Sequence, residues 1–158
     1  MSDTLMRGSS AGGEIRVLTA ITTELVNEAQ RIHHTYPTAT AALGRLLTGA
    51  ALMGAAGLKN ETDSMTIQIR GEGEIKNLVA VTDCQSRVRG YISNPYVDRP
   101  LNDKGKLDVG GAIGGGYMSV VRDLGLKEPY VGQTPLVSGE IAEDLTYYYA
   151  KSEQTPTS

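Results

Sequence analysis

Hydrophobic residues along the chain recur first with a helical period and later with a period of two, and this change predicts the order of the elements. Residues 1–13 are rich in Gly and Ser, and we expect them to form a flexible N-terminus, whereas residues 14–22 (EIRVLTAIT) alternate like a strand. In the following TTELVNEAQRIHH, apolar residues return every three or four positions, and Thr22 or Thr23 can cap the start. This pattern predicts a helix over residues 23–34.

The segment YPTATAALGRLLTGAALMGAAGLKN carries the strongest helical pattern in the chain. Pro37 suits a first helical turn, and Gly57 suits the position where a helix ends. Three glycines inside the segment, Gly44, Gly49 and Gly54, each cost a helix about 1 kcal/mol relative to alanine. Close packing of another element would offset this cost, so the segment predicts a buried central helix.

From Met65 onwards, apolar residues alternate with polar ones. MTIQIRG, IKNLVAVTD and RVRGYISNP are separated by short turn sequences, which predicts three strands of an antiparallel meander with one polar face and one buried face. The Gly-rich DVGGAIGGG leads into a fourth strand, YMSVVRD, and a turn-rich segment, LGLKEPYVGQTPLV, follows it. Ser138 can cap a last helix. The predicted class is α+β, a mostly antiparallel sheet with helices packed on one face.

Composition excludes several classes of function. The 158 residues have a net charge of −3 and no basic stripe, so we expect no nucleic-acid partner. The longest uncharged apolar run, Leu46–Leu58, is shorter than the roughly 20 residues that a bilayer requires, so we expect no membrane association. Cys84 is the single cysteine and cannot form an internal disulfide, which predicts a reducing, cytoplasmic location.

The glycine run GGAIGGG, Gly110–Gly116, invites comparison with phosphate-binding loops. Such a loop follows a strand and opens a helix, with its N–H groups aimed at the anion. Here the run precedes a strand-like segment, and no Lys-Ser or Lys-Thr pair follows it. A turn or mobile loop is therefore the favoured interpretation, and we predict no cofactor in this chain.

Cys84 with His33 or His34 offers a nucleophile and a base, with Asp83 or Asp144 as the group that orients the base. A lone cysteine at a strand end is more often a minor structural residue. The two adjacent histidines also lack the spacing of zinc ligands. We therefore predict no catalytic and no metal-binding residue, and we keep as the alternative a small-molecule-binding or thiol-dependent hydrolytic domain that uses Cys84.

Three tyrosines, Tyr147, Tyr148 and Tyr149, follow one another in the last predicted helix. Successive helical positions are about 100° apart, so the three rings cannot all enter one core face. Exposed aromatic side chains mark interfaces. Packing at the helix edge and contact with a partner therefore both remain open.

Longer stretches of the sequence agree with a known family. NEAQRIHHTYPTATAALGRLLTGAALMGA, MTIQIRGEGEIKNLVAVTD and VRGYISNP, followed by GKLDVGGAIGGGYMSVVRDLGLKEPYVGQTPLVSGEIAEDLTYYYAKSEQTP, closely resemble the heat-shock protein 33 family of redox-regulated bacterial holdase chaperones. The resemblance runs in order over residues 14–158. It implies an N-terminal chaperone domain that holds unfolding client proteins without ATP, and it implies no enzymatic activity.

In full-length members of that family, a C-terminal domain binds one zinc ion through four cysteines, in a C-x-C and a C-x-x-C pair, and loses the ion on oxidation. This chain contains neither pair, and Cys84 matches none of the four cysteines. The resemblance therefore implies that the C-terminal zinc and redox domain is absent. It also implies that residues 14–158 are a truncated N-terminal domain, which in the family continues with further strands.

The resemblance also implies partners. Active members of the family are dimers, some of them domain-swapped, so we expect a homodimer that binds unfolded client proteins. Tyr91, Tyr117, Tyr147, Tyr148 and Tyr149 are the candidate client or dimer contacts. A sheet edge or an apolar helix face left uncovered by the missing strands would favour self-association further.

Overall fold

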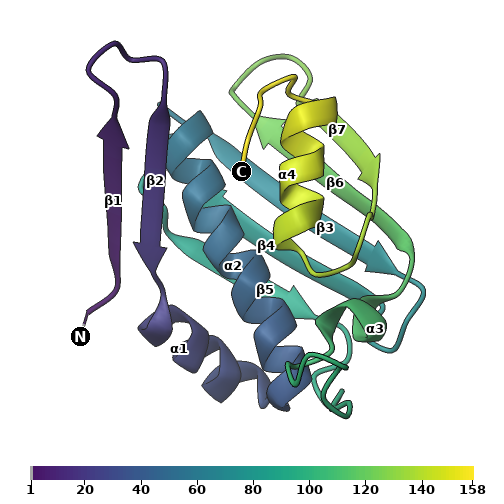
Figure 1. The fold of residues 1–158 in the computed structure, drawn as a ribbon. Helices are drawn as coiled ribbons and strands as arrows, with labels where there is room; N and C mark the ends of the chain where they lie inside the picture. Colours follow the sequence, from purple (N-terminus) through teal and green to yellow (C-terminus); the bar gives the residue numbers. More distant parts are fainter. Residues whose placement is uncertain (1) are drawn as a thin grey trace.

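A five-stranded antiparallel sheet with a long helix across one face forms the centre of the protein (Figure 1). The computed structural model describes residues 2–158. Its strands are β1 (Thr4–Ser9), β2 (Arg16–Ile21), β3 (Ser64–Gly71), β4 (Asn77–Asp83), β5 (Val88–Ile92), β6 (Gly116–Asp123) and β7 (Tyr130–Pro135). Its helices are α1 (Thr23–His33), α2 (Pro37–Gly57), α3 (Val109–Ile113) and α4 (Ala142–Lys151). The sheet order is β5-β4-β3-β6-β7, and β1 and β2 form a separate hairpin.

This architecture confirms the predicted α+β class. β3, β4 and β5 form the predicted meander, in which Ile67 lies opposite Ala80 and Ala80 lies opposite Gly90. The predicted fourth strand is β6, which pairs antiparallel with β3 on the other side of the meander. α1 occupies its predicted range except for the last residue, and α2 begins at Pro37 and ends at Gly57 as predicted.

The hydrophobic core lies between α2 and the sheet. Met65, Ile67 and Ile69 of β3 are buried there, as are Leu43 and Leu46 of α2. By length and composition alone α2 could cross a membrane, but 67% of its apolar window is buried inside the protein. In this structure α2 is therefore the central core helix of the domain.

Two glycines of α2 let neighbouring elements approach its backbone. A Cβ atom added at Gly49 would lie 2.5 Å from Cδ1 of Leu145 in α4. One added at Gly54 would lie 2.5 Å from Oγ1 of Thr82 in β4. Both distances are too short for a real side chain, so the close packing predicted for glycines inside this helix is confirmed at these two positions.

The N-terminus differs from its prediction. The sequence predicts a flexible stretch over residues 1–13, but Thr4–Ser9 forms β1 and pairs with β2, from Thr4 opposite Ile21 to Ser9 opposite Arg16. The prediction is wrong for these residues because β2 supplies backbone partners that composition alone does not reveal.

Asp3 caps α1 in place of Thr22 or Thr23. Its two carboxylate oxygens accept hydrogen bonds from the N–H groups of Glu24 (2.9 Å) and Leu25 (2.7 Å). Thr22 stands at the N-cap position without making a side-chain cap. The predicted local cap is therefore replaced by a residue that the β1–β2 hairpin brings back to the helix.

Two elements lie where the sequence predicts turns or loops. β7 runs through the turn-rich segment and pairs with β6, with Gly132 opposite Val120. α3 occupies part of the glycine run, over Val109–Ile113, and Asp108 accepts a hydrogen bond from the N–H of Gly111 at its start (3.0 Å). The mobile-loop prediction is wrong for this part of the run, because a neighbouring carboxylate fixes its backbone.

α4 begins at Ala142 and is capped by Asp144 rather than by Ser138. The Asp144 carboxylate accepts hydrogen bonds from the N–H groups of Val137 (2.7 Å) and Ile141 (2.9 Å). It is buried because these donors replace water around it. Ser138 lies before the helix, in the turn that Asp144 holds together.

Candidate functional site

Within residues 2–158, no helix covers one face of the five-stranded sheet. Figure 1 shows α2 and α4 on the same side of the sheet, and the residues of β3 that point to that side are buried. The alternate residues of β3, Thr66, Gln68 and Arg70, are only half-buried or exposed. We call this surface the open face; its apolar members are Val79, Val81, Tyr91, Tyr117, Val121 and Val131.

Strand register gathers the valines of the open face into a stripe. Val81 of β4 lies opposite Thr66 of β3, Thr66 lies opposite Val121 of β6, and Val121 lies opposite Val131 of β7. These four side chains form one row across the sheet. Val81 and Val121 are half-buried, and Val131 is 60% exposed. The row gives an apolar segment of another chain a continuous surface to lie on.

The open face also carries positive charge. Arg70 of β3 and Arg89 of β5 are exposed, and neither forms an ion pair within residues 2–158. Arg89 lies opposite Val81, at the end of the valine row. An apolar segment with acidic residues beside it would therefore match this surface better than a basic one.

The five predicted contact tyrosines fall into two groups. Tyr91 and Tyr117 lie on the open face and are 52% and 55% exposed. Tyr148 is fully buried, and Tyr147 and Tyr149 are half-buried on α4, on the other side of the sheet. The structure thus places two of the five on one exposed face and removes Tyr148 from any surface.

Tyr148 belongs to a polar network that attaches α4 to β6 and β7. Its hydroxyl donates to Oε1 of Glu153 (2.6 Å), and Glu153 pairs with Arg122 of β6 (2.7 Å). The Arg122 guanidinium lies 4.6 Å from the ring centroid of Tyr130 in β7. Burial, followed by the hydrogen bond to Glu153, raises the pKa of Tyr148 well above its usual value. The network is a structural attachment, closed to solvent at its centre.

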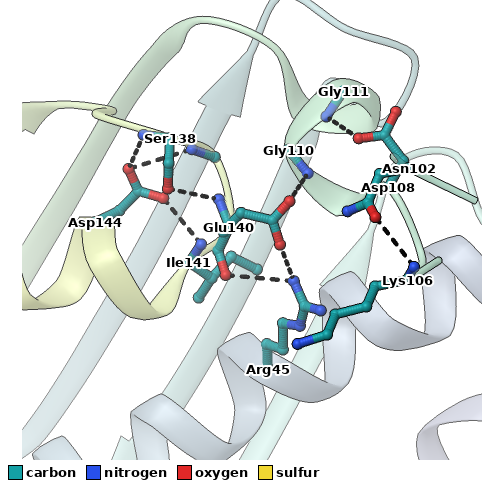
Figure 2. A network of polar contacts seen from close by, with 11 residues as sticks. Arg45, Asn102, Lys106, Asp108, Gly110, Gly111, Ser138, Glu140, Ile141 and Asp144 are labelled. Carbon is teal, nitrogen blue, oxygen red and sulfur yellow. Dashed lines mark hydrogen bonds and ion pairs between the residues drawn. The ribbon is translucent and has the colours of Figure 1, made fainter. Parts of the chain in front are cut away.

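A second network joins three helices around Glu140 (Figure 2). Arg45 of α2 donates to Oε2 of Glu140 (2.5 Å), and the N–H of Gly110 in α3 donates to Oε1 (3.0 Å). Glu140 directly precedes Ile141, whose N–H is held by Asp144 of α4. Figure 2 shows the Glu140 side chain between Arg45 on the body of α2 and Gly110 at the start of α3, with Ile141 and Asp144 beside it. Glu140 therefore fixes α2, α3 and α4 to one another.

This second network decides the role of the glycine run. The N–H of Gly110 is bonded to Glu140 and that of Gly111 to Asp108, so both donors already hold carboxylates. The hydrogen bond from the N–H of Gly111 lowers the pKa of Asp108 below its usual value, and the hydrogen bond from the guanidinium of Arg99 adds to this effect. These two N–H groups are therefore already occupied and are not free to bind a phosphate.

Cys84 does not share a hydrogen-bonded site with a histidine within residues 2–158. Its side chain is half-buried and packs against the hydrophobic core. Nε2 of His33 lies 3.0 Å from the carbonyl oxygen of Gly90, and Asp83 is paired with Arg87 (2.6 Å). The thiol, the imidazole and the carboxylate therefore do not form a nucleophile, base and orienting group.

The residues of this chain do not fit the zinc site that the resemblance implies for full-length proteins. That site needs four cysteine thiolates, and the chain has one cysteine. Residues 2–158 also contain no group of three or more His, Cys, Asp or Glu side chains placed to hold a metal ion. Zinc therefore has no part in the mechanism proposed below.

An apolar groove lies between α1, α2 and α4. It has a volume of about 680 Å³ and is lined by Val26, Ala41, Leu52 and Leu145 among others. Its charged side chain, Arg45, is already paired with Glu140. The groove therefore offers apolar contact and few free polar groups to orient a small ligand.

The valines of the open face are candidate contact residues that the sequence-based prediction missed. The sequence predicts one polar face for the three-stranded meander, and this prediction is confirmed for β3 but wrong for β4, where Val79 and Val81 lie on that face. The signal is present in NLVAVTD, where both alternating sets of residues are apolar. Such a strand is apolar on both sides, which indicates that its second face also has contacts to make.

Comparisons with known proteins identify the family of this chain. A family model described as Hsp33 protein matches residues 3–158. A 33 kDa chaperonin of Acetivibrio thermocellus is 55% identical over 157 residues, and one of Clostridium botulinum (strain Alaska E43 / Type E3) is 54% identical over 158 residues. Each match covers 99% of this chain and 53% of the relative.

A solved structure agrees with the sequence matches. The crystal structure of the 33 kDa chaperonin (heat shock protein 33 homolog) of Thermotoga maritima is similar to this chain with a TM-score of 0.92 and 49% identity. The similarity covers 96% of this chain and 52% of that one. The chain therefore spans about half the length of the relatives it matches.

Proposed function

This chain belongs to the Hsp33 protein family, and we propose that it is a client-holding domain, which binds unfolding proteins without ATP and prevents their aggregation. The relatives carry the name of a chaperonin and not of an enzyme.

The observation that carries the proposal is the valine row of the open face. Val81, Val121 and Val131 form an apolar surface on the sheet, and the exposed ring of Tyr117 lies further along β6 on the same face. Apolar surfaces of this kind mark sites of protein contact. An unfolding protein exposes apolar segments of many sequences, and an apolar row that runs across several strands can accept them without strict selection.

Holding on this surface requires no chemical step. Each square ångström of apolar surface removed from water contributes about 25 cal/mol. Arg70 and Arg89 add attraction for acidic residues of the client, which promotes encounter more than final affinity. A client that refolds withdraws its apolar residues and leaves, so no nucleotide is needed for release.

We further propose that a second copy of the chain is a partner, in a homodimer. Met6, Val17 and Ile21 lie on the outer face of the β1–β2 hairpin and are exposed. A two-stranded sheet alone is marginally stable in water. Covering this face by a second copy, with or without exchange of the hairpin, would stabilise it.

We also propose a cytoplasmic location, because the single cysteine of the chain cannot form an internal disulfide.

Two measurements test these proposals. The first is light scattering of a thermally unfolding client protein mixed with an equimolar amount of this chain, in reductant and again in peroxide. Equal suppression in both conditions supports a holding surface within this chain, and no suppression in either overturns the proposed function. The second is the molar mass in solution, where we expect a dimer for the unmodified chain and a monomer for Met6→Lys; a monomeric unmodified chain contradicts the dimer.

A further inference from the structure

The outer edge of β7 presents unpaired backbone groups beside the open face. The N–H of Leu136 donates to the carbonyl oxygen of Gly116 (2.8 Å), which makes these two residues a hydrogen-bonded pair. In an antiparallel ladder such pairs alternate with pairs whose N–H and C=O groups point away. The N–H and C=O groups of Val131 and Gln133 therefore point outward. Pro135 is the next outward-facing residue, and it has no N–H group.

The opposite edge of the same sheet is occupied. The N–H of Ser93 donates to the carbonyl oxygen of Asn77 (3.0 Å), so by the same alternation the backbone groups of Gly90 in β5 point outward. Nε2 of His33, at the end of α1, lies 3.0 Å from that carbonyl oxygen. α1 thus protects the β5 edge with a side chain from a neighbouring element.

No helix of residues 2–158 lies beside the β7 edge. Figure 1 shows β7 at the border of the sheet, with α4 in front of the covered face and not along the edge. Neither Val131 nor Gln133 makes a backbone hydrogen bond outside the ladder within the described residues. The β1 edge is less suitable, because exposed Arg7 stands at its centre and the hairpin has no further strands behind it.

We propose that the β7 edge is a docking site for an extended segment of an unfolded protein, which adds to the sheet as a further strand. Outward N–H and C=O groups that repeat every second residue are complementary to another extended backbone and to no other common ligand. The new strand would place every second side chain on the open face, next to Val131 and in line with the valine row. The proposal rests on the proposed holding function and names the form in which the client is bound.

Backbone pairing explains how one surface can hold many clients. The edge recognises only main-chain groups, which every unfolded segment carries, and the valine row selects for apolar residues at alternate positions. Pro135 limits the edge to a few residues, so a docked client cannot easily recruit further chains into an extended sheet.

The test uses a substitution that removes only an outward donor. Gln133→Pro deletes an N–H that takes no part in the pairing with β6, so the sheet keeps its internal hydrogen bonds. Gln133→Ala is the matched control, since it removes the same side chain and keeps the N–H. The probe is a short synthetic peptide of alternating valine and threonine with a glutamate at each end. A second peptide, N-methylated at every residue, has no N–H donor on either edge and cannot pair with β7 as a strand.

We expect the unmodified chain and Gln133→Ala to bind the first peptide with similar affinity, and Gln133→Pro to bind it about tenfold more weakly. The N-methylated peptide should bind weakly to all three. In the unmodified chain, which needs no substitution, the amide hydrogens of Val131 and Gln133 should exchange more slowly when the first peptide is bound.

The outcomes separate this inference from the proposed function. Unchanged exchange at both amides, with client aggregation still suppressed, overturns docking on the β7 edge and leaves holding intact. Loss of suppression by the unmodified chain itself overturns the holding function. Slower exchange at these amides together with weaker binding by Gln133→Pro supports docking by added strand.

Discussion

The ring of Tyr148 in α4 lies against the backbone of Gly132 in β7. A Cβ atom added at Gly132 would stand 2.9 Å from both Cε2 and the hydroxyl oxygen of Tyr148, and 2.5 Å from Oγ of Ser152 at the end of the same helix. Tyr148 is fully buried, and its hydroxyl is held by Glu153, so the ring cannot move aside without breaking that hydrogen bond. The contact fixes how closely α4 approaches the sheet.

Gly132→Ala should therefore destabilise the protein by about 1–3 kcal/mol, the usual cost of overpacking a core. Urea denaturation measures the change in the free energy of unfolding. Gly8→Ala in β1 is the control, because a Cβ atom at Gly8 meets nothing within 4 Å. Equal stability of the two variants would contradict the role given to the Tyr148–Gly132 contact.

Tyr148→Phe should lower the free energy of unfolding by about 1.5–3 kcal/mol, the range for a hydrogen bond to a charged group. The substitution keeps the ring on Gly132 and removes the donor to Glu153, which retains Arg122 as its partner. Tyr149→Phe is the comparison, because no hydrogen bond to its hydroxyl is formed within residues 2–158 and its loss should cost less. The measurement is again urea denaturation, and a larger effect at Tyr149 would be inconsistent with the network.

Asp108 should make the protein sensitive to acid. The N–H of Gly111, followed by Arg99, holds the folded-state pKa of Asp108 below its unfolded-state value of about 3.9. The stability that this carboxylate contributes is therefore present above that value and is lost as the pH falls through the depressed folded-state pKa.

Melting temperatures of the unmodified chain and of Asp108→Asn between pH 7 and pH 3 measure this contribution. The variant should melt lower at pH 7, and the difference should shrink toward pH 3. Asp103→Asn, at an exposed position in the same loop, should show no such convergence. A constant difference between Asp108→Asn and the unmodified chain across the whole range would show that the charge of Asp108 is not involved.

The sequence predicts an element of this fold when the residues that determine the element lie close to it in the chain. α2 and the β3–β4–β5 meander follow from periodic patterns and from Pro37 and Gly57 at the helix ends, which act within a few residues. The pattern does not predict β7, because Gly132 and Pro135 are residue types typical of turns. In the structure both residues suit an edge strand. Gly132 leaves space for the ring of Tyr148, and Pro135 lies at an outward-facing position, where no N–H is needed for pairing with β6.

The candidate site was predictable only in part for the same reason. Tyr91 and Tyr117 alternate with buried residues in strands that the sequence identifies, so their exposure could be expected. The sequence does not show which of Tyr147, Tyr148 and Tyr149 is buried, because the burial of Tyr148 depends on β7, which the pattern does not predict. The capping of α1 by Asp3 likewise needs the hairpin that brings residues far apart in sequence together.

Substituting the valine row should weaken holding without unfolding the sheet. In Val81→Thr/Val121→Thr the new side chains keep the shape and the strand preference of valine but lose its apolar character. Apolar burial worth about 1 kcal/mol at each position, about 2 kcal/mol for the pair, predicts about thirtyfold weaker client binding. Binding of a reduced, alkylated client that stays unfolded measures the effect. Val137→Thr, at an exposed valine outside the sheet, is the control, and equal loss in the control would remove the open face as the binding surface.

Cys84 separates a holding domain from a thiol-dependent one. Its side chain packs against the core and makes no hydrogen bond to His33 or His34 within the described residues, so Cys84→Ser should leave suppression of client aggregation unchanged in reductant and in peroxide. The same variant should lose about 1 kcal/mol of stability, because a hydroxyl replaces a half-buried thiol against apolar neighbours. Scattering assays on the folded variant, below its melting temperature, distinguish the two effects. If a folded Cys84→Ser no longer holds clients, or if peroxide changes holding by the unmodified chain alone, then the single thiol takes part in the activity and an apolar surface is not a sufficient account of it.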